Sequence, residues 1–89
     1  MFVAVACDFA NDDHAQEVIK LLGWYGFEKV QEGVWESASI PENTLARLKR
    51  DIDRNCDSFD SIRFYQFPME ETMVITSLKG KRWRRIILE

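Results

Sequence analysis

Hydrophobic and polar positions follow two different periods in the first third of the chain. Residues 2–7 (FVAVAC) are apolar at every position, which is typical of a strand buried on both faces. Apolar residues then recur at positions 15, 18, 19 and 22, the spacing of one helix face. Asn11 and two aspartates suit the start of this helix, and Gly23 and Gly26 suit its end. We therefore predict a strand followed directly by a helix.

The middle of the chain predicts a broken extended region and a second helix. The extended region spans about residues 27–37 and is interrupted near Gly33, where a tight turn or bulge is expected. Ser39-Ile40-Pro41-Glu42 then has the S-x-x-E form of a capping box, with the proline inside the first helical turn. The apolar stripe of the second helix consists of Leu45, Leu48 and Ile52.

The last third favours strands. One is predicted from residue 61 to 67 and ends at Pro68, another begins at residues 73–75, and a further one is expected at 83–88. The element order is then β-α-β-β-α-β with one or two extra strands. This is the order of the ferredoxin-like α+β fold, an antiparallel sheet with both helices on one face. We expect a single domain of this kind over residues 1–89.

Two helices cover only one side of such a sheet, yet its strands are apolar on both sides. Val3 and Val5 alternate with Ala4 and Ala6, and residues 62–67 repeat the pattern. A bare apolar face of several hundred Å² is unusual on a monomer. We favour a second copy stacked on this face as a two-fold dimer, with residues 73–89 packing on the partner. The alternative is that the C-terminal strands fold back over their own chain.

Composition adds a constraint on partners. The chain has 89 residues, 46 % of them apolar and 30 % charged, and a formal net charge of −3. Residues 1–37 carry −5, whereas residues 61–89 carry +3. A basic end lets a weakly acidic protein bind a polyanion, because the local field matters more than the total charge. No apolar stretch reaches the roughly 20 residues of a membrane span, and no basic residue precedes the first apolar run, so we expect a cytoplasmic protein.

Asp8 is the main candidate for chemistry. It ends the first strand with the parity of Ala4 and Ala6, so it points toward the face without helices. In a stacked dimer a nearby symmetry axis would bring it close to its own mate. Two carboxylates at short range need a raised pKa or a shared divalent cation, and such a cation can activate water against a phosphodiester. The alternative, equally weighted, is that Asp8 caps the following turn or helix.

Two groups of basic residues are candidates for nucleic-acid binding. The first follows one stripe of the second helix, and the second places five cations in seven residues around Trp83. The eight residues are Arg47, Arg50, Arg54, Lys79, Lys81, Arg82, Arg84 and Arg85. The competing explanation, stronger for the helix than for the tail, is a solvated surface whose charges pair locally.

Few other residues suggest chemistry. Cys7 and Cys56 form no C-x-x-C pair, so we expect reduced thiols rather than a disulfide or a metal site. His14 is the only histidine, and we expect a neutral, solvated imidazole in the first helical turn. The chain has no Gly-rich phosphate loop and no zinc-ligand spacing.

Three stretches, in order and without gaps, resemble the small CRISPR-associated protein that partners the spacer integrase, the Cas-two family. They are VACDFAND at residues 5–12, VIKLLGWYG at residues 18–26, and VQEGVWE at residues 30–36. The resemblance implies a homodimer that binds double-stranded DNA and bridges integrase subunits of the Cas-one family during spacer acquisition. It also implies magnesium-dependent cleavage of RNA or DNA with Asp8 as the metal ligand, and a final strand that pairs with the partner's sheet.

The chain departs from this family where His14 and Ala15 replace a basic pair that is often found there. Without those cations beside the metal, we expect cleavage to be weak and secondary to DNA binding. A stand-alone, toxin-like ribonuclease of the VapD type, which shares this fold, is the alternative function. A small-molecule regulatory module on the same fold is a third hypothesis with less support.

Overall fold

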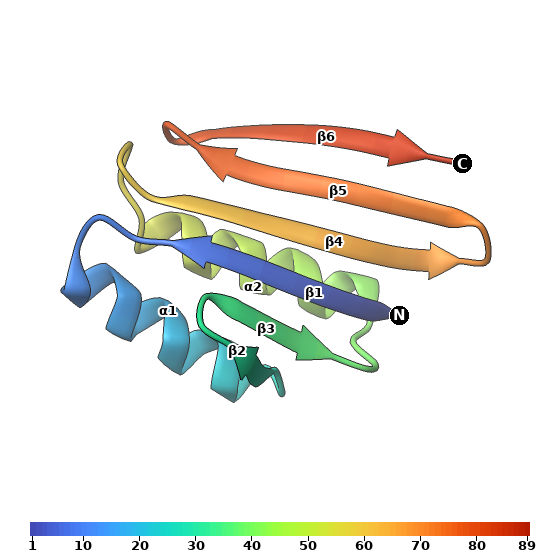
Figure 1. Ribbon diagram of the computed structural model, residues 1–89, viewed down its shortest axis with the longest axis horizontal. Helices are drawn as coiled ribbons and strands as arrows, with labels where there is room; N and C mark the ends of the chain where they lie inside the picture. Colours follow the sequence, from blue (N-terminus) through green and yellow to red (C-terminus); the bar gives the residue numbers. More distant parts are fainter.

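The structure is a computed structural model that describes all residues, 1–89. The chain forms six strands and two helices in the predicted order, so the ferredoxin-like α+β prediction is confirmed (Figure 1). The elements are β1 (Phe2–Asp8), α1 (Asp12–Trp24), β2 (Glu28–Gln31), β3 (Val34–Ser37), α2 (Glu42–Arg54), β4 (Ser61–Met69), β5 (Thr72–Lys79) and β6 (Arg82–Leu88).

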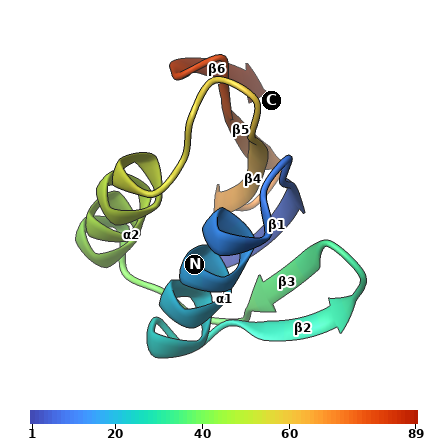
Figure 2. The same ribbon diagram turned by 90° about the vertical axis from the view of Figure 1, so that its left-hand side faces the viewer.

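The six strands form one antiparallel sheet in the order β2-β3-β1-β4-β5-β6. Both helices pack against the same side of it, and no element of the chain covers the other side (Figure 2). β5 and β6 extend the sheet beyond β4 and do not turn back across it. The alternative that the C-terminal strands cover the apolar face is therefore wrong, and we call that side the open face.

The core lies between the helices and the covered face of the sheet. Val3 and Val5 of β1 and Phe64 of β4 are completely buried there. Against them pack the apolar stripes that the sequence predicted, Val18 and Leu22 from α1 and Leu45, Leu48 and Ile52 from α2. Periodicity therefore predicted the buried positions of α2 and two of those of α1, because each helix buries a single stripe. Ile19, which was also assigned to the stripe of α1, is 37 % exposed, so that part of the prediction is wrong.

The two helices start differently. Asn11 caps α1 as predicted, since its side-chain oxygen accepts hydrogen bonds from the backbone N–H groups of Asp13 and His14 at 2.7 and 3.3 Å. The capping box predicted for the second helix is wrong, because Pro41 occupies the N-cap position and no side chain caps α2. Instead, Ile40 is tied to the start of β1 by two hydrogen bonds with Met1, which position the helix from outside.

Gly33 makes the turn between β2 and β3 that the sequence predicted. Its φ is +74°, and a Cβ there would lie 2.9 Å from the carbonyl oxygen of Cys7. The Cys7 N–H donates to the Gly33 carbonyl at 2.7 Å, so the turn holds the end of β1 next to Asp8. A side chain at position 33 would be strained and would collide with this contact.

Candidate nucleic-acid interface and metal-binding residues

The open face has an apolar half and a basic half. Directly opposed residues of antiparallel strands share a face, so the register assigns each side chain. The apolar half contains Phe2, Ala4, Tyr65, Phe67, Met73, Ile75, Ile86 and Leu88. The basic half contains Ser61, Arg63, Ser77, Lys79, Arg82 and Arg84. The two halves occupy opposite ends of the same strands, and Asp8 lies at the basic end opposite Ser61.

Much of the apolar half is exposed in the isolated chain, although Ile75 at its centre is only 9 % exposed. Phe67, Ile86 and Leu88 are 43, 47 and 46 % exposed. Phe2 packs against Phe67 with ring centroids 5.7 Å apart. Contiguous exposed apolar side chains of this kind are typical of an interaction surface.

The basic half joins three strands in two cross-strand rows. Arg63, Ser77 and Arg84 form one row, and Ser61, Lys79 and Arg82 form the next. None of the four cations takes part in an ion pair. The sequence analysis missed Arg63, because it is isolated in a strand and joins the cluster only through pairing with β5.

The eight basic residues predicted from the sequence lie in three different places. Lys79, Arg82 and Arg84 lie on the open face. Lys81 occupies the β5–β6 turn and pairs with Asp53 at 2.9 Å, and Arg85 lies on the helix side, where it lines a cleft with Lys49. The remaining three, Arg47, Arg50 and Arg54, are exposed on α2, and Arg54 contacts Asp51 of the same helix at 3.3 Å. The tail therefore does not form one basic surface, since alternate residues of β6 point to opposite faces.

Asp8 is exposed at the end of β1, on the face that its parity predicted. Its side chain forms no hydrogen bond or ion pair within the chain, and Asn11, not Asp8, caps α1. The alternative explanation as a helix cap is therefore excluded for this residue. An accessible carboxylate without a partner is free to bind a cation.

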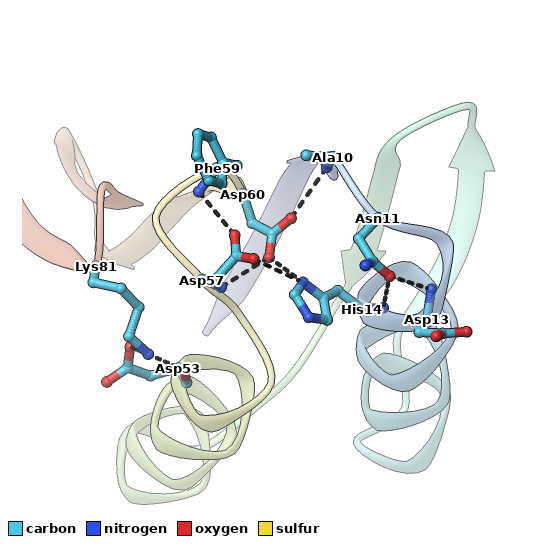
Figure 3. A network of polar contacts seen from close by, with 9 residues as sticks. All are labelled: Ala10, Asn11, Asp13, His14, Asp53, Asp57, Phe59, Asp60 and Lys81. Carbon is cyan, nitrogen blue, oxygen red and sulfur yellow. Dashed lines mark hydrogen bonds and ion pairs between the residues drawn. The ribbon is translucent and has the colours of Figure 1, made fainter.

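A second group of potential ligands lies in the loops next to the end of β1 and was not expected. His14 Nδ1 is 2.7 Å from Asp60 and 3.8 Å from Asp57 (Figure 3), and ligand atoms of the three residues lie within 4.8 Å of one another. Asp60 is 1 % exposed and accepts hydrogen bonds from the backbone N–H groups of Ala10 and Asp57 at 3.1 and 2.9 Å. It therefore joins the β1–α1 loop to the α2–β4 loop.

Hydrogen bonds decide the charge of Asp60. Burial would raise its pKa, but the N–H groups of Asp57 and Ala10 and the His14 side chain together hold the pKa below its ordinary value. His14 is thus not the solvated imidazole that the sequence predicted. No local signal could have found this contact, because its two residues are 46 positions apart.

The two carboxylate sites differ in their fitness for magnesium. Mg²⁺ takes oxygen ligands and keeps several waters, which the accessible Asp8 allows. The Asp60 oxygens are already occupied by three donors, and an imidazole nitrogen suits zinc or other transition metals better than magnesium. Asp8 therefore fits magnesium provided that further ligands come from outside the chain. The His14–Asp57–Asp60 group instead fits a structural role, in which it holds the β1–α1 and α2–β4 loops together.

Neither cysteine is a nucleophile at neutral pH. Both are free thiols, as predicted. Burial raises the pKa of Cys7 to about 12 and that of Cys56 to about 11, so the reactive thiolate form is scarce.

A comparison against protein families assigns the chain to a family. A family model described as CRISPR associated protein Cas2 matches residues 1–74. The chain belongs to the Cas2 family. No curated protein and no solved structure gives a significant match. Membership of this family confirms the resemblance that the sequence shows on residues 5–36. It also shows that the chain has a CRISPR-associated function in defence. The helices of this Cas2-family chain are too short or too polar to cross a membrane.

Proposed function

We propose that the chain is a cytoplasmic homodimer that binds double-stranded DNA and acts as the adaptor of a Cas-one-type integrase during spacer acquisition, with weak magnesium-dependent endonuclease activity at Asp8. The observation that supports this function best is the open face, which combines an apolar half, a basic half and a free carboxylate on one sheet.

The distribution of residues on the open face favours one way of stacking two copies. A two-fold axis parallel to the strands places apolar half on apolar half and brings both copies of Asp8 to the same end of the interface. A two-fold axis that lies in the plane of the interface but runs perpendicular to the strands would instead lay apolar residues on the partner's Arg63 and Arg84. The first arrangement is favoured because it buries apolar area against apolar area and places no arginine against an apolar side chain.

The edge strand β6 supports contact with a partner as well. All seven of its residues are exposed, although Trp83, Ile86, Ile87 and Leu88 are apolar. An exposed apolar edge strand is a template for pairing with another chain. In the proposed assembly residues 73–89 contact the second copy or the integrase.

Asp8 of each copy would hold the magnesium ion in this dimer, together with water and substrate oxygens. When bound, the ion would polarise a phosphodiester and lower the pKa of a bound water. The chain's own contribution is to keep the carboxylate unpaired at the end of a rigid central strand. Weak cleavage is expected, because His14 is engaged by Asp60 and no arginine occupies the start of α1.

The dimer is tested by sedimentation equilibrium of the wild type and of Ile86→Asp. We expect the wild type to sediment as a dimer and Ile86→Asp as a monomer, because a carboxylate within the apolar half would be buried without a partner. Trp24→Gln is the matched control, since Trp24 is 88 % exposed on α1, away from the open face, and should stay dimeric. A monomeric wild type would refute the proposal.

Function is tested on the same proteins with duplex DNA, the integrase subunit of the same CRISPR system, and RNA. Asp8→Asn should abolish magnesium-dependent cleavage and retain DNA binding and integrase association. Cleavage that survives in Asp8→Asn would remove Asp8 from the mechanism. Cleavage of RNA without retention of duplex DNA at low salt would favour the VapD-type ribonuclease instead.

A further inference from the structure

A cleft lies on the helix side of the sheet, between α2 and the last three strands, and we call it the helix-side cleft. Its volume is about 220 Å³. Its walls include side chains of α2 and of β4, β5 and β6, namely Leu45, Ala46, Lys49, Gln66, Thr76 and Arg85. β5 and β6 carry the sheet past the edge of α2 (Figure 2), which leaves this space uncovered. Because the cleft and the open face lie on opposite sides of the sheet, stacking of two open faces would leave the cleft accessible.

The floor of the cleft is polar where the surrounding sheet is apolar. Gln66 and Thr76 are only 7 and 9 % exposed, on the same face of β4 and β5 as the buried Phe64 and Leu78. The Thr76 hydroxyl donates to Gln66 Oε1 at 3.0 Å. The amide nitrogen of Gln66 forms no hydrogen bond within the chain, so its N–H donors remain free for the cleft that Gln66 lines. A buried side chain with a free donor suits a ligand that accepts hydrogen bonds.

Two cations flank this floor. Lys49 Nζ lies 5.4 Å from the ring centre of Phe64, so the ammonium group is turned inward over the sheet. Arg85 is directly opposite Thr76 in the strand register and lines the same cleft. Neither cation takes part in an ion pair. Burial and then the nearby Arg85 lower the pKa of Lys49 to about 8, as expected of two cations that face each other with no anion between them.

We propose that the helix-side cleft binds the carboxylate group of a small organic acid, with Lys49 and Arg85 as its charged ligands and Gln66 as a neutral donor. A guanidinium group offers paired donors that match the two oxygens of a carboxylate, and lysine adds a point charge. A bound carboxylate would also relieve the repulsion between the two cations. Binding should therefore stabilise the folded chain, which gives a readout that is independent of any enzymatic activity.

The rest of the lining favours a carboxylate on a carbon chain over an inorganic anion. Met1, Leu45 and Ala46 form the apolar part of the cleft and suit the body of an organic acid. Glu42 lines the cleft as well, about 10 Å along the α2 axis from Lys49. A phosphate group carries about −1.5 to −2 charges at pH 7, so Glu42 would repel it more strongly than a carboxylate with a single charge.

The experiment follows the side-chain amide resonances of Gln66 by ¹H–¹⁵N NMR during titration with sodium hexanoate, against sodium chloride at matched ionic strength. We expect these resonances to shift to saturation and the Tm to rise. Arg85→Gln should weaken binding about ten- to a hundredfold, because it removes hydrogen bonds to a charged group. Arg84→Gln is the matched control, since it removes the same charge from the other face of β6, and should bind hexanoate as the wild type does.

Two results would overturn the proposal. One is a wild type whose Gln66 amide resonances do not move with hexanoate, and the other is equal affinity of Arg85→Gln and the wild type. Lys49→Gln gives a second test of the charged ligands and should also bind more weakly.

Shape and ligand class are tested with the same resonances. Ala46→Leu should fill the cleft and weaken hexanoate binding with no change of charge, so unchanged affinity in this variant would contradict a shaped site. Acetate has almost no carbon body and should bind more weakly than hexanoate. Inorganic phosphate that shifts the Gln66 resonances at lower concentration than hexanoate would overturn the choice of a carboxylate.

These results can be separated from the proposed function. The cleft is built by one chain, so monomeric Ile86→Asp and Asp8→Asn should both bind hexanoate even if the dimer or the role of Asp8 proves wrong. Loss of binding in Ile86→Asp would contradict a site within one chain. Conversely, Arg85→Gln should remain dimeric, because Arg85 lies on the helix side of β6.

Discussion

The two faces of the central sheet are made from the same strands, but their side chains differ in burial. On the covered face, Val5, Phe64 and Leu78 are fully or almost fully buried in the core beneath the helices. On the open face, Phe67 and Ile86 remain nearly half exposed beside unpaired arginines. The covered face stabilises the fold, whereas the open face is available for partners. Substitutions on the two faces should therefore change different quantities.

The largest effect on stability is expected from Phe64→Ala on the covered face. Removing a completely buried aromatic ring should lower the free energy of unfolding by about 3–5 kcal/mol. Phe67→Ser, three residues away on the open face, should change the stability of the monomer by less than about 1 kcal/mol and weaken self-association. Urea unfolding and sedimentation equilibrium measure the two quantities. Equal losses of stability would show that the open face is covered within one chain.

A smaller effect is expected at two carboxylates, Asp8 at the end of β1 and Asp60 directly before β4. Asp60→Asn should lower the free energy of unfolding by about 2 kcal/mol, because charged hydrogen bonds contribute roughly 1.5–3 kcal/mol each and the amide offers one acceptor less. Asp8→Asn is the control, since Asp8 has no partner, and should stay within about 0.5 kcal/mol of the wild type. Urea unfolding at pH 7 compares them.

The Asp60 contribution also has a predictable pH dependence. Its pKa is held below the ordinary value of 3.8 in the folded chain, so the unfolded chain binds more protons in acid. The stability that Asp60 provides is complete above pH ~4 and is lost as the pH falls through the folded pKa. The difference between the wild type and Asp60→Asn should thus narrow in acid. If the difference in the free energy of unfolding between the wild type and Asp60→Asn did not change with pH, the charge of Asp60 would play no part in stability.

The smallest effect is expected at Lys49, which lies in the cleft behind β5 and β6. Burial, followed by the nearby Arg85, lowers its pKa from 10.5 to about 8. Between these values the unfolded chain holds a proton that the folded chain has released, so stability should rise with pH in that window. Lys49→Met should lack this rise, as measured by urea unfolding at pH 7 to 11. If stability still rose with pH in Lys49→Met, the rise would come from another titratable group.

Local patterns predicted most of the fold but only part of the site. The stripes of α1 and α2, the turn at Gly33 and the direction of Asp8 were all readable, because each depends on residues within one or two turns of chain. The capping box failed because Met1 positions Ile40 from another element. The basic tail was recognised as a run of cations, yet Arg85 points away from Arg84, and Arg63 joins from a different strand.

Hydrophobic periodicity alone was enough to predict two helices on one sheet and a first strand that is apolar on both sides. This is possible because the side chains that an element buries must recur with the period of that helix or strand. What it left undetermined was which distant residues become neighbours. The His14–Asp60 contact and the basic cluster on three strands arise from register and loop closure. Both depend on the packing of the entire chain and leave no trace in the spacing of residues.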